Sequence, residues 1–339
     1  MTMRIRPGGQ ADLDALYQLA CQTGAGLTNL PPDRDVLAAK LIRSEAAFAR
    51  ADLPPDDELY VFLAEDTDTG HICGTAQIFS RIGMRWPFYN YRLTAISQSS
   101  KELGRTFRAE MLNLVTDFDG ATEVGGLFLL PQARTGGIGG LLARSRYLFI
   151  AMHRRRFGAT VMAELRGVGD DAGNAPFWEG LGQKFFGMTF QEADRFNALH
   201  GNQFIADLMP KHPIYTALLA ERARAAIGQQ GTGGTAARAM LEEEGFRYDG
   251  YIDIFDGGPA LAAPTAQLRT VRDARNARVS GALGNGDEGA PAIVASGGAS
   301  MFNATFANIA AEGDSVTMSK SALATLGLKP GDEITYVFR

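Results

Sequence analysis

The sequence has only two cysteines, Cys21 and Cys73, in 339 residues, which excludes a scaffold of several disulfides and favours a reducing compartment. It has no basic excess either, because 33 basic residues stand against 38 acidic ones, so a nucleic-acid footprint is not expected. No apolar run approaches the roughly 20 residues of a membrane span. Residues 1–7 lack the apolar stretch of a signal peptide. We therefore expect a cytoplasmic protein with neither nucleic-acid nor membrane partners.

Histidine is also scarce, with four residues in the whole chain. His71 follows an expected hairpin turn and His153 adjoins three arginines, so both are expected on the surface. His200 stands near an expected helix end. His212 is the histidine that we single out as a candidate catalytic group, although the neighbouring Pro213 favours a structural role for it.

The composition that remains is that of a soluble globular protein, with 45% hydrophobic and 21% charged residues. The length favours two domains, or one large domain with an appendage. Apolar spacing predicts an opening strand, two helices and a run of antiparallel strands, which together indicate an α+β fold. The expected elements are strands at 3–7, 59–64, 72–78, 124–130 and 161–165, and helices at 34–51 and from the loop at 134–140 to 156.

The second half repeats one pattern faintly. A helix at 236–244 ends in Gly-Phe before a strand at 251–254, which suggests a degenerate second copy of an earlier unit. Residues 280–290 are typical of a linker or exposed loop, and the last 50 or so residues are typical of a small β-rich appendage. We expect domains at 1–200, 201–279 and 280–339.

A glycine-rich loop joins the strand at 124–130 to the following helix, with the sequence Arg134-Thr135-Gly136-Gly137-Ile138-Gly139-Gly140. Glycines allow the backbone to approach a phosphate, and the helix N-terminus offers unpaired N–H groups and the positive end of its dipole. Arg134 adds a guanidinium donor for an anion. Ordinary tight turns are also rich in glycine, so the loop alone leaves that alternative open.

Two common nucleotide motifs do not match this loop. A Walker loop requires Gly-Lys-Ser/Thr, which is missing here. A Rossmann fingerprint requires a βαβ unit, and the antiparallel strands expected upstream argue against one. The pattern Arg-x-x-Gly-x-Gly resembles instead the loop of the GNAT acyltransferases, and residues 177–182 (FWEGLG) resemble the next helix of that fold.

The GNAT resemblance implies a mixed, mostly antiparallel sheet flanked by helices, with a possible second GNAT-like unit. It also implies coenzyme A or an acyl-CoA as co-substrate, with no metal. In that fold the loop amides hold the pyrophosphate, and the strand before the loop splays to admit the pantetheine arm. The residues expected to contact the co-substrate are Leu127, Leu129, Arg134, Thr135, Gly136, Gly137, Ile138, Gly139 and Gly140.

Residues 208–215 (LMPKHPIY) and 244–259 (EGFRYDGYIDIFDGGP) are long, specific stretches that resemble arginine N-succinyltransferase. The likeness covers about residues 4–280. It implies transfer of succinyl from succinyl-CoA to the α-amine of L-arginine, opening an arginine catabolic route, with Leu127 in the place of the family's succinyl-CoA-contacting leucine. Shorter stretches of the same resemblance are 23–31 (TGAGLTNLP), 89–92 (YNYR), 100–103 (SKEL), 163–168 (AELRGV) and 176–178 (PFW).

The sequence departs from that family at the assigned proton donor. The family has a histidine in an Ile-Gly-Gln-x-His stretch, whereas here residues 227–230 (IGQQ) are followed by Gly231. A second family histidine is replaced by Gln98. The catalytic assignment of the family therefore cannot be carried over intact.

Acyl transfer from a thioester requires a deprotonated amine, stabilisation of the carbonyl oxygen and departure of the thiolate. Backbone N–H groups near Leu127 and Leu129 can stabilise the oxyanion. Glu164, on the strand after the loop helix, is a candidate for orienting or deprotonating the amine, and a structural pairing with Arg166 or another cation is the alternative. His212 is the other catalytic candidate.

Charged substrates need charged partners, since a guanidinium is bound by carboxylates and a succinyl carboxylate by arginine or lysine. Ion pairs, turn caps and core packing are the structural alternatives. The candidates are Asp253 and Asp256 for the guanidinium, Arg92, Arg166 and Lys211 for the carboxylate, and Tyr89 and Tyr91 for the wall of the acceptor pocket.

The sequence therefore predicts an N-acyltransferase that uses succinyl-CoA and L-arginine. Ornithine or another basic amino acid, or a different acyl-CoA, is the alternative within the same enzyme class. A rival of another class is a CoA-binding but catalytically weak subunit that pairs with an active paralogue, and Gly231 favours this rival. A homo-oligomer is the other assembly that we expect.

Overall fold

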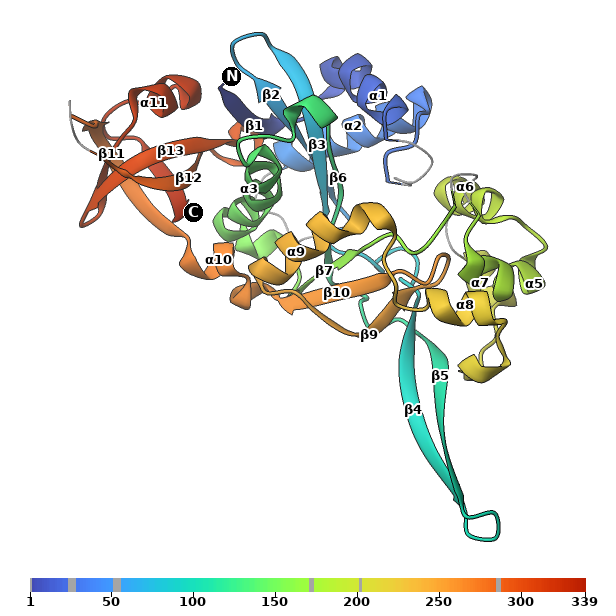
Figure 1. Ribbon diagram of the computed structural model, residues 1–339. Coiled ribbons are helices and arrows are strands. Elements are labelled where there is room, and N and C mark those ends of the chain that lie inside the picture. Colours follow the sequence, from blue (N-terminus) through green and yellow to red (C-terminus); the bar gives the residue numbers. More distant parts are fainter. Residues whose placement is uncertain (1, 24–28, 51–55, 171–173, 201–202, 285–287) are drawn as a thin grey trace. The chain divides into compact units, whose positions relative to one another are not determined.

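The computed structural model describes residues 2–23, 29–50, 56–170, 174–200, 203–284 and 288–339 (Figure 1). Parts of two stretches discussed above, 24–28 and 285–287, lie outside these residues. The chain forms two compact units built from separate segments. Unit 1 comprises Met1–Arg81, Thr122–Ala159 and Pro264–Arg339, and unit 2 comprises Ile82–Ala121 and Thr160–Ala263. The expected domains are continuous in sequence, and that division stays a prediction.

The opening strands of unit 1 pair as the alternating apolar pattern predicts. β1 and β3 both run antiparallel to β2, and β6 is antiparallel to β3. The predicted first strand and the hairpin after it are therefore confirmed. These strands are β1 (Met3–Pro7), β2 (Leu59–Asp66), β3 (His71–Phe79) and β6 (Thr122–Leu129).

Helices cover both faces of this part of the sheet. A Cβ on Gly74 of β3 would meet Leu142 of α3, whereas Lys40 of α2 lies over the ring of Phe79. Residues 74 and 79 are an odd number apart on one strand, so α3 and α2 lie on opposite faces. The helices of unit 1 are α1 (Leu13–Cys21), α2 (Arg34–Ala49), α3 (Ile138–Met152), α10 (Arg269–Asp273) and α11 (Lys320–Leu326).

The core of unit 1 centres on the buried ring of Phe149 in α3. Its centroid lies 5.1–5.5 Å from the rings of Phe48, Tyr60, Phe62 and Phe302. Tilted and edge-on aromatic contacts at this spacing add to the stabilisation from apolar burial. The helix that follows the glycine-rich loop is therefore fixed to the sheet and to the C-terminal segment.

The last five strands close into a small barrel. β12 pairs with β15 and also with β13, while the order β15-β11-β14-β13 completes the ring. Residues 280–282 belong to β11, which corrects the predicted loop at 280–290, because pairing with β14 extends the strand. The predicted β-rich appendage is thus confirmed. Its strands are β11 (Arg275–Ala282), β12 (Ala290–Ser296), β13 (Asn303–Glu312), β14 (Ser315–Met318) and β15 (Glu333–Phe338).

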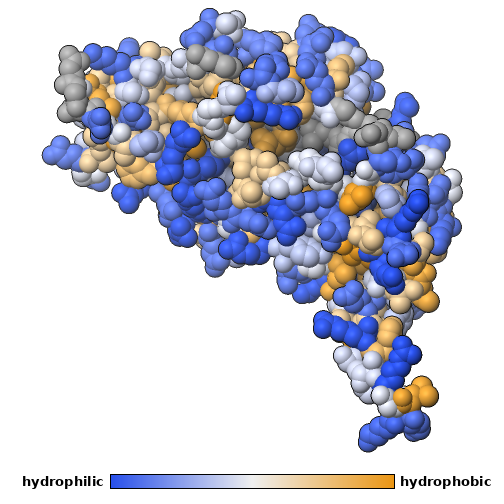
Figure 2. All heavy atoms as spheres, in the orientation of Figure 1, coloured by the Kyte–Doolittle hydropathy of each residue, from blue (hydrophilic) through white to orange (hydrophobic). Residues whose placement is uncertain are grey.

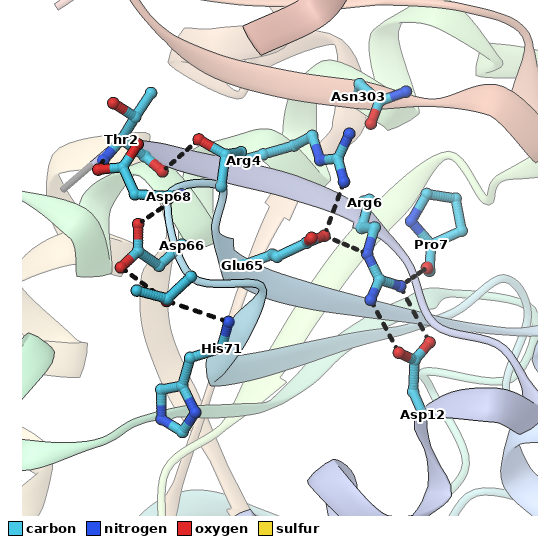
Figure 3. Close-up of polar contacts among 12 residues, drawn as sticks. Thr2, Arg4, Arg6, Pro7, Asp12, Glu65, Asp66, Asp68, His71 and Asn303 are labelled. Carbon is cyan, nitrogen blue, oxygen red and sulfur yellow. Dashed lines mark hydrogen bonds and ion pairs between the residues drawn. The ribbon is translucent and has the colours of Figure 1, made fainter.

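A charged network fastens β1 to its neighbours, as Figure 3 shows. Arg6 donates to both carboxylate oxygens of Asp12, at 2.8 and 2.9 Å, and also to Glu65. Arg4 donates to the same Glu65 at 2.9 Å. Burial opposes ionisation of Asp12, but its hydrogen bonds with Arg6 lower its pKa below the usual value.

The strands of unit 2 follow the order β7-β10-β9-β4-β5-β8. Its core contains Tyr91, Phe177 and Trp178, all nearly inaccessible to solvent. The chain before α8 runs as β8 and a single 3-10 turn. The elements are β4 (Asn90–Ser100), β5 (Arg105–Val115), β7 (Thr160–Glu164), β8 (Ile214–Tyr215), β9 (Arg247–Asp253), β10 (Pro259–Pro264), α4 (Pro176–Gly180), α5 (Gln183–Phe186), α6 (Phe190–His200), α7 (Gln203–Leu208), α8 (Glu221–Ala226) and α9 (Thr235–Glu244).

β4 and β5 form a long arm whose eleven residue pairs run from Asn90 and Val115 to Ser100 and Arg105 (Figure 1). Only its base pairs with other strands of the described chain, with β9 at residues 90–92 and with β8 at residues 111–112. Figure 2 shows apolar surface at the far end of the arm. The exposed apolar side chains of the arm are Ile96, Leu103 and Phe107.

Candidate functional site

The glycine-rich loop lies where the sequence predicts it, between β6 and α3 in unit 1. Gly136 and Gly137 have φ of 60° and 79°, the left-handed region that favours glycine, and Gly137 caps α3. A Cβ on Gly136, Gly139 or Gly140 would meet no atom of the described chain within 4 Å. Thr135 is exposed whereas Ile138 is buried. The loop thus presents an open backbone surface at a helix N-terminus, which is suited to an anion.

Arg134 fixes the start of the loop. Its Nε donates to the carbonyl oxygen of Leu129 at 2.9 Å, so the guanidinium is tied to the end of β6 while the side chain stays exposed. No carboxylate of the described residues lies within ion-pair distance of Arg134. The cation therefore lies beside the helix N-terminus with its charge unneutralised.

β6 contains a bulge just before the loop. Gln77 of β3 pairs with Gly125 and Thr75 pairs with Phe128, so two residues, Gly126 and Leu127, face one on β3. Gly126 has φ of 57°, and a Cβ there would lie 2.8 Å from the Gln77 side chain. Arg146 of α3 donates to the Gly125 carbonyl at 3.2 Å. The predicted acyl-contacting Leu127 therefore belongs to a bulge, where the regular strand pairing is interrupted.

A buried polar cluster lies beside this bulge, and we did not predict it from the sequence. Lys40 donates to the Asn29 carbonyl at 2.7 Å, and Gln77 donates to the same oxygen at 3.2 Å. Glu123, only 8% exposed, accepts from the Asn29 side chain and faces Lys40. Lys40 stands one turn from the buried Leu37 and Ser44. A lysine on that buried face of the helix is the sequence signal by which the cluster could have been predicted.

Burial shifts the pKa values of Lys40 and Glu123 toward neutral pH, while each group favours the charged form of the other. Burial raises the pKa of Glu123 to about 7, although Lys40 and Asn29 oppose the shift. Burial likewise lowers the pKa of Lys40 to about 8, opposed by Glu123 and assisted by Arg43. Two buried acceptors on the same face of β3, Thr75 Oγ1 and Gln77 Oε1, have no hydrogen-bond partner among the described residues. The cluster combines a group that titrates near neutral pH with acceptors that are still available.

In unit 2, Glu164 ends β7 and accepts a hydrogen bond from Asn90 Nδ2 at 2.8 Å. Asn90 is fully buried at the base of the arm and also donates to the Ile252 carbonyl at 3.4 Å. Glu164 therefore has an amide partner in Asn90, and its structural pairing with Arg166 or another cation stays a prediction. Glu164 itself is half-buried.

The aromatic and basic candidates at the base of the arm differ in their surroundings. Tyr91 is a core residue, 6.2 Å from the ring of Phe177, and its buried hydroxyl has no partner in the described chain. Tyr89 is partly buried against the same cluster. Arg92 lies 5.0 Å above the ring of Tyr251, with Asp117 and Asp249 at 3.8 and 3.6 Å. The guanidinium of Arg92 is therefore already partnered.

Asp253 and Asp256 brace the turn between β9 and β10. Asp253 accepts from the backbone N–H groups of Phe255 and Asp256, and Asp256 accepts from those of Gly167 and Gly258, at 2.7–2.8 Å. Burial raises the pKa of both carboxyls, and for Asp253 the neighbouring Asp256 raises it further. This hydrogen bonding is typical of a structural turn.

One further acid, Asp194 on α6, is close enough to Asp256 and Arg166 to be influenced by both. Burial raises the pKa of Asp194 to about 6; Asp256 adds to the shift and Arg166 opposes it. Because Asp194 lies about 60 residues from Asp256 in the sequence, no local pattern indicated this group. Arg166 therefore faces two acids inside unit 2.

The remaining candidates lie on turns. Lys211 and His212 are exposed, and no interaction with other described residues holds either side chain. Gly231 donates its N–H to the Arg166 carbonyl at 2.9 Å, and a Cβ there would lie 2.8 Å from the Gly167 carbonyl oxygen. The position at which the resembling family has histidine thus packs closely against the segment that follows β7.

Each unit gathers part of the predicted site. Unit 1 brings together Leu127, Leu129 and residues 134–140, and unit 2 contains Glu164, Arg166 and the other polar candidates. Within the described ranges, no group of three or more His, Cys, Asp or Glu side chains is placed to hold a metal ion. No helix in those ranges is long and apolar enough to cross a membrane.

Family models match most of the chain. The model described as arginine N-succinyltransferase beta subunit matches residues 3–270, and that of its C-terminal domain matches residues 275–338. An arginine N-succinyltransferase of Enterobacter is 40% identical over 99% of this chain and 97% of its own. One of Citrobacter koseri is 45% identical over 80% and 79%. The solved structure of arginine/ornithine succinyltransferase subunit AI from Pseudomonas aeruginosa matches with a TM-score of 0.89 and 31% identity, covering 99% and 98% of the two chains.

Proposed function

Because the chain belongs to the arginine N-succinyltransferase family of acyltransferases, we propose that it transfers succinyl from succinyl-CoA to the α-amine of L-arginine. The amine nitrogen attacks the thioester carbonyl, a C–N bond forms, and the C–S bond breaks to release the CoA thiol. The match over nearly the whole chain carries this proposal. Ornithine is the second acceptor to test, since the name of the matching Pseudomonas subunit includes it.

The loop from Arg134 to Gly140 is proposed to bind the pyrophosphate of the co-substrate. Its open glycines allow close approach, and the N–H groups of the first turn of α3 point out of the helix. Gly137→Glu places bulk and negative charge in the left-handed cap. We expect this variant to lose CoA affinity by at least about 100-fold in calorimetry, as a lost anion site and a strained backbone predict. Unchanged affinity would exclude this placement.

The bulge at Gly126 and Leu127 is proposed to stabilise the oxyanion. Backbone N–H groups of a bulge are freed from regular pairing and can point at a developing charge. Leu127 and Leu129 would then line the acyl group.

Glu123 is proposed as the proton acceptor for the α-ammonium. It precedes Leu127 by four residues on the same strand, and near neutral pH it exists partly as a base. Glu164 and His212 are the other candidates. The variants Glu123→Gln, Glu164→Gln and His212→Ala compare the three residues. The base is the residue whose loss removes the rise of kcat with pH.

Assembly into a homo-oligomer is proposed to use the arm. On one face of the arm the exposed Ile96 pairs with the buried Ala109, and the exposed Phe107 pairs with Gln98, so that face carries exposed apolar surface. An isolated two-stranded ribbon is at best marginally stable in water. Residues 90–115 hold four basic and two acidic side chains, whereas the remaining chain has seven more acidic than basic ones, which favours a second copy as partner. Light scattering on the purified chain tests this assembly. A monomer would favour pairing with a paralogous subunit instead.

Thiol release from succinyl-CoA, measured with and without L-arginine and with ornithine as a comparison, tests the proposed reaction. We expect arginine-dependent release and an N-succinyl product by mass spectrometry. No thiol release, with CoA binding intact, would indicate another acceptor or a partner subunit.

We also propose a cytoplasmic location. The two free cysteines, one exposed and one buried, are consistent with it.

A further inference from the structure

The C-terminal barrel reaches the glycine-rich loop at Arg339, which follows β15, and at Phe306 of β13. A Cβ built on Gly137 would lie 2.7 Å from Arg339 Nη2 and 3.7 Å from the ring of Phe306. Both residues belong to unit 1. The guanidinium therefore lies directly against the residue that caps α3.

Arg339 is held in this position from several sides. Its backbone N–H donates to the Pro291 carbonyl at 3.0 Å, and its guanidinium carbon lies 4.2 Å from the centroid of Phe306 on β13. Arg144 of α3 donates to the carbonyl of the preceding Phe338 at 3.2 Å. The same helix that carries the loop thus anchors the strand that delivers the arginine.

The charge of Arg339 has no partner of opposite sign in the described part of the chain. The side chain is exposed, stacks on an aromatic ring and forms no ion pair there, just as Arg134 forms none. Two guanidiniums, one before the loop in sequence and one brought from about 200 residues away, therefore flank the same helix N-terminus. A phosphate group is the ligand that this arrangement fits, because guanidiniums bind its oxygens in a forked geometry.

We propose that Arg339 binds the pyrophosphate of the acyl-CoA, so that the C-terminal barrel completes the co-substrate site. This inference rests on the proposed function and adds to it a role for the domain at residues 275–338. Arg134, Arg339 and the N–H groups of the loop would then hold the phosphates together.

Calorimetry with CoA tests this proposal without depending on the acceptor. We expect Arg339→Gln to weaken CoA binding about tenfold, the loss of one charge-assisted hydrogen bond, and Arg339→Lys to restore part of it. In turnover, the KM for succinyl-CoA should rise while kcat and the KM for arginine stay unchanged. Affinity equal to that of the unaltered protein would overturn the proposal. Failure of the unaltered protein to bind CoA would instead overturn the proposed function.

Arg278→Gln is the matched control, since it removes one exposed arginine of the same barrel. Arg278 lines a cavity of about 910 Å³ together with Ala151 and Met152, at the other end of α3 from the loop. A fifteen-residue helix is roughly 22 Å long, so this charge lies far from Gly137. We expect CoA affinity to be unchanged, and an equal loss in both variants would show a general charge effect and overturn the proposal.

Dephospho-CoA identifies which phosphate is bound. This probe keeps the pyrophosphate and lacks the 3′-phosphate of the ribose. The penalty of Arg339→Gln should be the same with CoA and with dephospho-CoA. A penalty that disappears with dephospho-CoA would assign Arg339 to the 3′-phosphate and overturn the pyrophosphate assignment.

Discussion

Glu123 in unit 1 and Asp256 in unit 2 are equally buried, each only 8% exposed, yet their surroundings differ in kind. Asp256 receives backbone N–H groups on both carboxylate oxygens. Glu123 faces a lysine and an asparagine side chain and has a pKa of about 7. Burial alone therefore does not show which role a buried acid has. The donors suggest a difference to test, because the backbone N–H groups fix the carboxylate of Asp256 in a turn, whereas the only donors and cations that face Glu123 among the described residues are side chains.

Glu123→Gln is expected to have the largest effect on activity. If Glu123 accepts the ammonium proton, kcat should fall about 100-fold, within the range of general-base catalysis. The rise of kcat with pH near 7 should vanish with it, because no carboxylate is left to titrate. Steady-state thiol release checks this, with circular dichroism to confirm folding. A kcat within twofold of the unaltered protein would remove Glu123 from the chemistry and end the contrast with Asp256.

Asp256→Asn should act on stability. One carboxylate oxygen becomes an NH₂ group that faces a backbone donor, which should cost about 1–3 kcal/mol of unfolding free energy. Denaturant titration checks this, with the largely exposed Asp249→Asn of the neighbouring strand as control. Unchanged stability with a KM for arginine raised about 100-fold, some 2.7 kcal/mol, would show that Asp256 binds the guanidinium, as the sequence predicts.

Lys40→Met should move the pH profile without abolishing activity. Lys40 favours the charged form of Glu123, so its removal raises the pKa of Glu123 further above about 7. Because the base is the deprotonated form, the ascending limb of kcat should shift to higher pH by about one unit, and activity at pH 7 should fall accordingly. Arg43→Met is the control, since Arg43 acts on Lys40 rather than on Glu123. If the ascending limb of the kcat–pH profile does not shift, the interaction of Lys40 with Glu123 does not affect turnover.

The same pair predicts a pH effect on stability. The folded-state pKa of Glu123 lies above its ordinary value, so protonated Glu123 favours folding. That contribution is complete below about pH 4.5 and is lost as the pH rises through about 7. In Glu123→Gln this part of the pH dependence of unfolding should disappear, which denaturant titrations at pH 5 and pH 8 would measure.

His212→Ala should have the smallest effect. The side chain is exposed and no described residue holds it, so kcat should stay within about twofold, as for most surface substitutions. Disappearance of the neutral-pH limb in this variant, with folding intact, would make His212 the proton acceptor and leave Glu123 a structural acid.

The sequence alone determined the features that depend on local order. The strand, glycine-rich loop and helix around residues 124–152 follow from an apolar run, glycines able to adopt positive φ and a helical repeat, and the structure places them as predicted. The long family-like stretches were also sufficient to indicate an arginine N-succinyltransferase. These signals lie within short windows, where backbone propensities and motif spacing act.

Tertiary structure decided which distant groups meet. Lys40 and Glu123 are more than 80 residues apart, and Arg339 is about 200 residues from Gly137, so no window of sequence links them. Pairing of β3 with β6, packing of α2 on the sheet and closure of the C-terminal barrel bring them together. The pKa values of these groups and the partners of their charges depend on the tertiary structure, because desolvation and the neighbouring charges are set by the packing of the molecule.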